Sequence, residues 1–173
     1  MPIPSSPLPL KFGVAPSYIW VDAGLASTLL DYLVQQFPDI SASEWLSRIA
    51  RGEVVDQSGH VLAANTKLSR GMCIYYYREL ANEARIPFEE QIVYEDAHLL
   101  VADKPHFLPV TPAGQYLRET LLCRLRHRTG NAELTPLHRL DRETAGLVLF
   151  AKRAQDRGAY QALFRDEAIH KTY

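Results

Sequence analysis

The residues most able to do chemistry lie together in the segment 138–146, which reads HRLDRETAG. Its aspartate, Asp141, has one arginine two residues before it and another directly after it. Positive neighbours favour the charged form of a carboxyl group, so we expect the Asp141 carboxylate to stay ionised even if it is partly buried. An ionised, oriented carboxylate can act as a nucleophile, a general base or a structural anion, and spacing alone does not choose among these.

His138 gives the same segment an alternative interpretation. Paired with Asp141, it would supply the acid and the base of a hydrolase. A lone histidine is more often a hydrogen-bonded structural residue, and no serine or cysteine nucleophile motif accompanies it in the sequence. The hydrolase is therefore a rival hypothesis that only this pair favours.

The sequence gives no sign of cofactor chemistry. Cys73 and Cys123 each lie within an apolar run, away from any histidine cluster, which predicts reduced core cysteines and not metal ligands. Neither metal-ligand spacing nor a glycine-rich phosphate loop is present. We therefore expect no cofactor and no metal.

The net charge of -1 hides an asymmetry along the chain. Residues 1–116 contain 8 Lys/Arg and 13 Asp/Glu, whereas residues 117–173 contain 11 Lys/Arg and 7 Asp/Glu. The basic stretch includes Arg124, Arg126 and Arg128 in alternate positions. A surface for an anionic partner such as nucleic acid is therefore expected in the carboxyl-terminal third.

Hydrophobic patterning divides the 173 residues into four parts. The proline-rich residues 1–25 predict an extended leader without the features of a signal peptide or a membrane span. Residues 26–80 predict a small domain, the polar residues 81–90 a linker, and residues 91–173 a second domain. We expect a cytoplasmic protein that does not contact a membrane.

The small domain of residues 26–80 is expected to begin with two helices. The first ends before Pro38, because proline disfavours helical geometry in the residue that precedes it. The second begins at a capping box formed by Ser41 and Glu44 and stops at Gly52. Short extended pieces follow and predict a small sheet.

The second domain is expected to mix strands and helices. Apolar runs at 92–94 and 99–102 predict a hairpin. The further expected elements are, in order, a helix over 116–128, a turn at 135–136, a strand over 146–151, a helix over 154–165 with Tyr160, Leu163 and Phe164 inward, and a strand over 168–173. This order predicts an α+β fold with a largely antiparallel sheet.

Three motifs in this order resemble a known family. The string at 138–146 is similar to the HRLD-x-x-T-S-G signature of pseudouridine synthases that act on ribosomal or transfer RNA. Upstream, Lys104 and the proline after it resemble the family's lysine-proline segment, and downstream residues 170–173 (HKTY) resemble its Lys-x-Tyr segment. Residues 26–80 resemble the αL-type RNA-binding domain that stands in front of many of these enzymes.

The resemblance implies an isomerase that converts specific uridines of ribosomal or transfer RNA to pseudouridine without a cofactor. Asp141 takes the place of the catalytic nucleophile, and Tyr173 takes the place of the tyrosine that stacks on the flipped base. Arg139 takes the place of the arginine that holds the vacated space in the RNA open. The RNA-binding residues expected from the resemblance and the charge pattern are Arg139, Arg142, Lys104, Arg124, Arg126 and Arg128. No obligate protein partner is expected, which implies a monomer.

Two features depart from the family pattern. Ala145 stands where the signature usually has serine, which removes a hydroxyl near the nucleophile. The chain ends at Tyr173, whereas the family continues with further strands and with a basic residue that pairs with the catalytic aspartate. We therefore expect a truncated form, and the alternative function is a non-catalytic RNA-binding module or an inactive fragment of such an enzyme. Basic and acidic residues nearly balance in the αL-like region, so we expect it to bind RNA weakly by itself.

Overall fold

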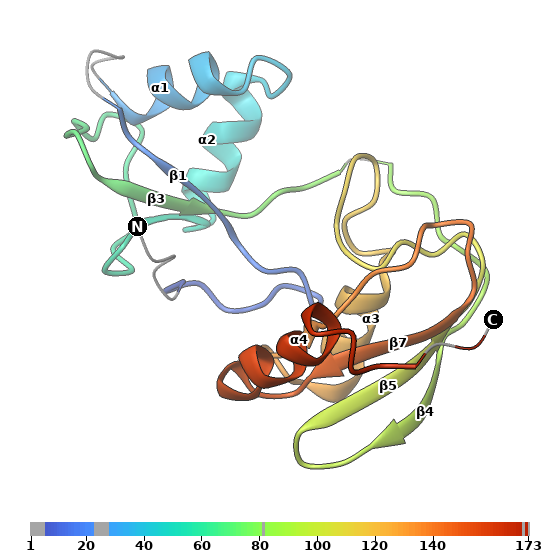
Figure 1. Ribbon diagram of the computed structural model, residues 1–173. Helices are drawn as coiled ribbons and strands as arrows, with labels where there is room; N and C mark the ends of the chain where they lie inside the picture. The colour runs from blue at the N-terminus through green and yellow to red at the C-terminus, as the bar shows by residue number, and fades with distance from the viewer. Residues whose placement is uncertain (1–5, 23–27, 81, 171, 173) are drawn as a thin grey trace. The chain divides into compact units, whose positions relative to one another are not determined.

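The computed structural model describes residues 6–22, 28–80, 82–170 and 172. The chain forms two compact units (Figure 1). The first comprises Met1–Lys11 and Ala15–Arg78, and the second comprises Phe12–Val14 and Glu79–Tyr173. Each unit combines helices with its own antiparallel sheet, which confirms the predicted α+β class.

The first unit contains a three-stranded sheet. Its strands are β1 (Ser17–Trp20), β2 (Val54–Asp56) and β3 (Cys73–Tyr76), in the order β1-β3-β2. β1 lies in the stretch predicted to be an extended leader, and that prediction is wrong for these residues because all four pair with β3. Leu8 also packs on the sheet, against Val55 and Tyr75. Both segments therefore belong to the folded unit.

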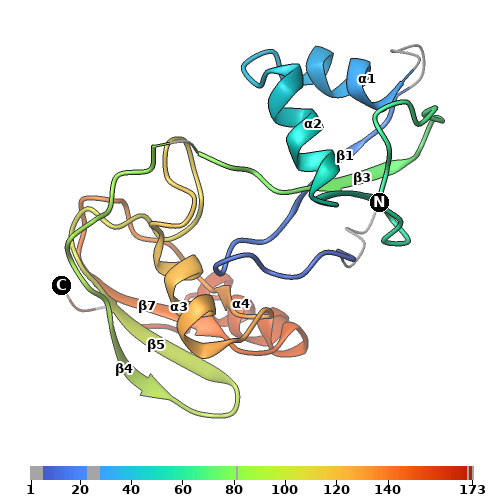
Figure 2. The same ribbon diagram turned by 180° about the vertical axis from the view of Figure 1, so that it is seen from behind.

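Two helices, α1 (Leu29–Gln36) and α2 (Ala42–Ala50), cover one face of this sheet (Figures 1 and 2). The indole of Trp45 is fully buried, and its centroid lies 5.5 Å from that of the Tyr76 ring in an edge-on contact. Leu33 of α1 is buried in the same cluster. Burying side chains of this size stabilises the fold by roughly 2 kcal/mol each, so the cluster joins the helices to the sheet.

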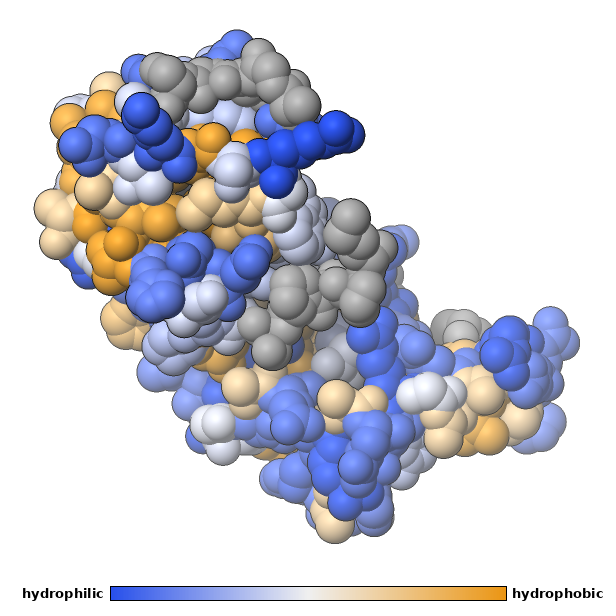
Figure 3. All heavy atoms as spheres, turned by 90° about the vertical axis from the view of Figure 1, so that its left-hand side faces the viewer, coloured by the Kyte–Doolittle hydropathy of each residue, from blue (hydrophilic) through white to orange (hydrophobic). Residues whose placement is uncertain are grey.

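On the face drawn in Figure 3, apolar side chains gather on this unit, whereas hydrophilic ones predominate over the second.

The start of α2 confirms the predicted capping box. The Ser41 hydroxyl accepts the N–H of Glu44 with an N···O distance of 3.3 Å, and the Glu44 carboxylate accepts the N–H of Ser41 at 2.9 Å. Two backbone groups that an uncapped helix would leave without partners are thereby satisfied. Gly52 follows the helix with φ of +70°, the left-handed geometry expected of a helix stop.

The second unit is built on a four-stranded antiparallel sheet. Its strands are β4 (Gln91–Glu95), β5 (Leu99–Lys104), β6 (Thr135–Pro136) and β7 (Gly146–Ala151), in the order β4-β5-β7-β6. The predicted hairpin is confirmed, and the Asp96 carboxylate fixes its turn by accepting the N–H groups of His98 and Leu99, each at 2.7 Å. The strand over 146–151 is confirmed as well. The predicted turn at 135–136 is instead a short edge strand paired with β7.

Helices α3 (Leu121–Thr129) and α4 (Arg157–Arg165) lie on opposite faces of this sheet, as the two views of Figures 1 and 2 show. On the α3 side, Leu121 and Leu125 are fully buried in one cluster with Leu100 of β5 and Phe150 of β7. This cluster is the main core of the unit.

The face under α4 is less completely covered. A short 3-10 turn, Ala154–Asp156, precedes α4. Leu163 was expected to face inward, but its side chain is 44% exposed, and that expectation is wrong. Tyr160 and Phe164 are half-buried. The strand predicted over 168–173 does not form at 168–170 or at 172, and the remaining two residues of that stretch lie outside the described residues.

The predicted linker over 81–90 is wrong for residues 82–90, because they are bonded to the segment that precedes α3. The Glu83 carboxylate accepts the N–H groups of Leu117, Arg118 and Glu119 at N···O distances of 2.5–3.0 Å. These bonds hold residues 117–119 outside the helix predicted to start at 116. The helix begins instead at Leu121, where the Thr120 hydroxyl accepts the N–H of Cys123.

Removing the capping box tests how the first unit is stabilised. We expect Ser41→Ala to lower the free energy of unfolding of this unit by about 1 kcal/mol, because the N–H of Glu44 loses its partner. Urea unfolding followed by circular dichroism measures the change. Ser58→Ala, in the turn after β2, is the matched control, because no hydrogen bond of its hydroxyl is found among the described residues. Equal effects of the two substitutions would contradict the capping role.

Candidate functional site

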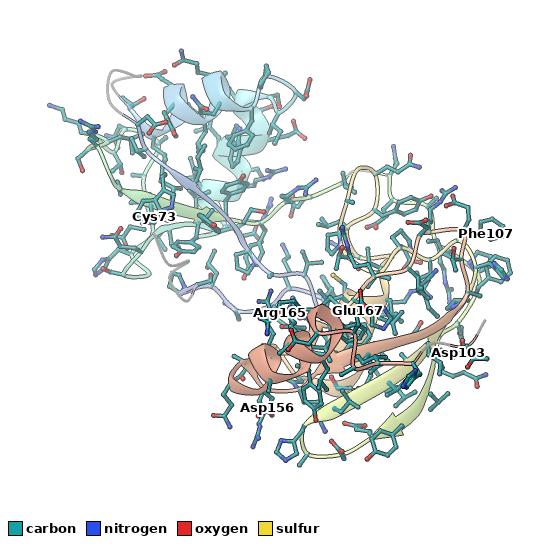
Figure 4. All side chains as sticks on the ribbon, viewed as in Figure 1. Cys73, Asp103, Phe107, Asp156, Arg165 and Glu167 are labelled. Carbon is teal, nitrogen blue, oxygen red and sulfur yellow. The ribbon has the colours of Figure 1, made fainter. Side chains whose placement is uncertain are left out.

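The register of two neighbouring strands brings the sequence motifs together. Lys104, the last residue of β5, lies opposite Gly146, the first residue of β7. The lysine-proline segment therefore leaves the sheet at the end where the segment 138–146 enters it. Figure 4 shows Asp103 and Phe107 at this end of the second unit, one on β5 and the other on the loop that follows.

Lys104 is buried at this end of the sheet, with no exposed surface. Its ammonium group donates hydrogen bonds to the carbonyl oxygens of Pro105 at 2.9 Å, Leu108 at 2.8 Å and Arg142 at 3.1 Å. Burial lowers the pKa of Lys104, and the negative charges of Glu143 and Asp141 act in the opposite direction. The Lys104 ammonium group, predicted to contact RNA, is bonded in the structure to carbonyl oxygens of two loops, which it holds together.

Asp141 lies on one of these loops, and its side chain is exposed. Its carbonyl oxygen accepts the N–H of Thr144 at 3.1 Å, which closes a turn around the carboxylate. Within the described parts of the chain, that carboxylate has neither a hydrogen bond nor an ion pair. It is accordingly available for nucleophilic or basic chemistry.

Neither of the arginines near Asp141 in sequence forms an ion pair with it among the described residues. The Arg142 guanidinium bonds to the Glu143 carboxylate at 2.8 Å and to the hydroxyl of Tyr116 at 2.9 Å. Those two bonds raise the pKa of Arg142, with the bond to Glu143 the larger cause. Arg139 is exposed, and the described residues offer it no ion pair.

A cavity of about 510 Å³ adjoins this loop. Its lining joins the motif segment to the last described part of the chain, with Arg139, Leu140, Thr144 and Gly146 on one side and Phe164, Ile169 and His170 on the other. A cavity of this size is in the range of small-molecule sites. The residue predicted to stack on a base, Tyr173, lies outside the described residues.

His138 is engaged by the sheet and not by Asp141. Its Nε2 accepts the N–H of Leu149 at 3.2 Å, and its ring centroid lies 5.0 Å from that of Phe164. Because no bond joins His138 to the Asp141 carboxylate, the geometry argues against the acid/base pair of the rival hydrolase hypothesis.

The guanidinium groups of the α3 arginines are mostly bonded to other groups of the same unit. The Arg124 guanidinium donates to the carbonyl oxygens of Ile86 and Phe88, both at 2.7 Å, and to the carboxylates of Glu90 and Glu119. Its side chain is 17% exposed. Arg124, predicted to contact RNA, thus has all of these partners within its own unit.

Arg126 and Arg128 have internal partners as well. Arg126 donates to the carbonyl oxygen of Leu134 at 3.1 Å, and burial lowers its pKa. Arg128 bonds to the buried carboxylate of Glu90 at 2.5 Å, although nearly half of its side chain is exposed. Both arginines, predicted to bind RNA, thus have partners within the unit, and the charge of Arg128 is partly neutralised by Glu90.

Sequence reasoning missed two residues that the structure places beside the motif. His106 Nδ1 lies 2.6 Å from the carbonyl oxygen of Glu143. Tyr116 holds the Arg142 guanidinium both by its hydroxyl and by its ring, whose centroid is 5.7 Å away. For His106, the available signal was its position two residues after Lys104 in the sequence. No sequence signal identifies Tyr116, which was predicted to start a helix.

Neither a metal site nor a membrane-spanning helix is found in the part of the chain that the structure describes. No group of three or more histidine, cysteine, aspartate or glutamate residues is arranged there to hold a metal ion. None of the helices described is long and apolar enough to cross a membrane.

Comparison with known proteins gives consistent matches. The family model described as RNA pseudouridylate synthase matches residues 98–173. An uncharacterised RNA pseudouridine synthase of Synechocystis is 29% identical over 84% of this chain and 50% of its own length. A second such protein, of Helicobacter pylori, is 41% identical over 49% of this chain and 28% of its own length. The tRNA pseudouridine(31) synthase of Saccharomyces cerevisiae is 38% identical over 47% of this chain and 20% of its own length. The chain thus spans half or less of the length of these relatives.

The three bonds of Lys104 predict a large effect on stability. We expect Lys104→Met to lower the free energy of unfolding of the second unit by roughly 3 kcal/mol, because one buried and two part-buried hydrogen bonds are lost. Lys152→Met is the matched control, since Lys152 also donates to a carbonyl oxygen, that of Asp96, but nearer the surface. We expect the control to cost about 1 kcal/mol or less. Chemical denaturation measures both, and a Lys104→Met protein as stable as its control would contradict the bridging role.

Proposed function

Residues 98–173 belong to the RNA pseudouridylate synthase family, and on that premise we propose that this protein isomerises uridines of ribosomal or transfer RNA to pseudouridine with Asp141 as the nucleophile. The observation that carries the proposal is the exposed Asp141 carboxylate. It lies on a turn fixed by buried Lys104 and has no partner among the described residues. A carboxylate held in this way is free to attack a substrate atom.

The reaction needs only a carboxylate and a space in which the base can turn. The bond between N1 of uracil and C1′ of the ribose breaks, and a bond between C5 and C1′ forms. N1 gains a proton and C5 loses one, so the atoms balance without a cofactor. Asp141 would act on the anomeric carbon, on the pyrimidine ring or on a sugar proton, and all three routes begin at the same oxygen atoms.

Reaching the target atoms requires flipping the uridine out of the RNA stack, which costs a few kcal/mol. Exposed Arg139 borders the cavity beside the motif and is assigned to hold the space left by the base. Tyr173 is assigned by sequence resemblance to stack on the flipped uracil. Stacking on an aromatic ring contributes roughly 1–3 kcal/mol per base, which offsets much of the flipping cost.

The first unit is assigned to weak, supporting RNA contact. Three of its six basic side chains are engaged within the unit. Arg48 is buried, and both Arg51 and Lys11 bond to Glu53. Three exposed cations remain: Lys67, Arg70 and Arg78. Since affinity for RNA grows with the number of phosphates neutralised, so small a set supports binding that depends on the second unit.

The contribution of Arg139 can be read from the salt dependence of binding. We expect Arg139→Gln to weaken binding to RNA and to reduce the slope of log affinity against log salt by about 0.7–0.9. Filter binding at several salt concentrations measures the slope. Arg165→Gln is the control, because Arg165 is neutralised by Asp166 at 2.8 Å and should leave the slope unchanged. Unchanged affinity and slope for Arg139→Gln would contradict its assignment.

Asp141→Asn tests the nucleophile directly. The amide keeps the size of the side chain but removes the attacking anion, so RNA binding should persist within about twofold while pseudouridine formation falls by on the order of 10³-fold or more. Mass spectrometry of RNA taken from cells that lack the protein, before and after incubation with each variant, measures the product. Asp103→Asn is the control, because Asp103 is an exposed aspartate of the same sheet that should leave turnover unchanged.

The outcomes separate the hypotheses. Substantial turnover by Asp141→Asn would refute the nucleophile assignment. If the unaltered chain binds RNA but forms no pseudouridine, the result would favour the non-catalytic RNA-binding module over the enzyme. Hydrolysed RNA without a carbon–carbon glycoside would favour the hydrolase.

A further inference from the structure

Two phenylalanine rings are exposed beside the site without a role in the core. The side chains of Phe88 and Phe107 are 46% and 48% exposed. Their ring centroids lie 6.0 Å apart at an interplanar angle of 37°, and the ring of His106 lies 6.0 Å from that of Phe107. Large apolar side chains grouped on a surface lose the stabilisation that burial would give them, and such groups often mark binding sites.

The backbone of Phe107 adopts a conformation that bulky residues rarely take. Its φ is +67°, a left-handed geometry that glycine adopts freely and that a bulky side chain adopts at a cost. The geometry is imposed by the site, because the Lys104 ammonium binds the carbonyl oxygens of Pro105 and Leu108 on either side of the turn. Glycine would fit this turn better, so the ring at Phe107 serves something other than the fold.

The aromatic pair is bonded to the loop that carries Asp141. His106, the residue before Phe107, contacts the carbonyl oxygen of Glu143 through Nδ1 at 2.6 Å. Lys104, three residues before Phe107, binds the carbonyl oxygen of Arg142. The segment that carries Phe107 is therefore bonded on both sides to the loop of Asp141, and Phe88 contacts it through the ring of Phe107. Figure 4 shows Phe107 at the margin of the second unit, on the loop after β5.

The chemistry of this surface fits an unpaired nucleotide. Aromatic faces next to cations bind single-stranded RNA, because each base stacks on a ring while the cations neutralise phosphates. Exposed Arg139 supplies positive charge on the same loop as Asp141. Bases inside a duplex are already stacked on both faces, so the rings would discriminate in favour of loops.

We propose that Phe107 and Phe88 form a stacking platform for an unpaired RNA base that neighbours the target uridine. The platform rests on the proposed function and adds to it a preference for uridines in single-stranded loops. It is separate from Asp141 and Arg139, because it binds a flanking nucleotide and not the uracil that reacts.

Phe107→Gly separates this role from a structural one. Glycine relieves the strain of the left-handed backbone, so thermal stability should be unchanged or higher. Loss of one stacked base should at the same time weaken binding of an RNA hairpin with a uridine-containing loop by about 5- to 100-fold. Binding of the fully paired duplex of the same composition should not change. Fluorescence anisotropy with labelled RNA measures both affinities, and calorimetry measures the stability.

Phe12 offers a control of the same kind within the second unit. It is another exposed phenylalanine with positive φ, +53°, and its ring is covered by the Arg118 guanidinium at 4.6 Å. Phe12→Gly should leave binding of the hairpin within about twofold of the unaltered protein. Phe107→Trp, which keeps an aromatic face, should retain hairpin binding.

Several results would overturn the platform. One is a hairpin affinity of Phe107→Gly that equals that of the unaltered protein, and another is an equal loss of affinity for hairpin and duplex. A lower melting temperature of Phe107→Gly would show a structural role. A change in its oligomeric state would identify the rings as a protein contact. An unaltered protein that binds neither RNA would overturn it as well. Turnover by Asp141→Asn would refute the nucleophile but leave the hairpin preference standing, so the two proposals fail separately.

Discussion

The ammonium group of Lys104, enclosed at the end of β5, ties together the two loops on which the site is built. A buried charge is costly unless every donor finds an acceptor, and here three carbonyl oxygens surround it. One of these acceptors belongs to the turn of Asp141, and the other two bracket the turn of Phe107. The strand register, which sets Lys104 opposite Gly146, is what makes the bridge possible. The carboxylate proposed as the nucleophile thereby has a fixed support.

A second network explains why the basic end of the chain leaves less positive charge unpaired than its composition suggests. The carboxylate of Glu90 is buried and receives Arg124 and Arg128, while Glu119 also pairs with Arg124. These arginines hold the segment after the first unit against α3. Positive charge counted along the sequence is thus partly neutralised in the fold. What remains for a polyanion near the motif is concentrated on the loop of Asp141, where Arg139 has no ion pair among the described residues. Aromatic rings at the same loop junction can add affinity without adding charge.

Local signals were sufficient where they act over a few residues. The capping box at Ser41, the hairpin turn at Asp96 and the strand after the motif were predicted, because each depends on neighbours in sequence. Predictions failed where a distant side chain decided the local geometry. Glu83 holds residues 117–119 outside α3, and β1 pairs with a strand more than fifty positions later. Neither partner can be identified from patterning within a short window.

The sequence by itself determined the α+β class, the position of the candidate nucleophile and the resemblance to pseudouridine synthases, because residue types and motif order are properties of the chain alone. The tertiary structure decided which charges are free. It placed Lys104 and Arg124 in the interior, turned Arg142 toward Glu143 and Tyr116, and left the carboxylate of Asp141 unpaired among the described residues. It also exposed the ring of Phe107 on a left-handed turn. Burial and pairing arise from contacts between residues far apart in sequence, so the spacing of charged residues could not reveal them.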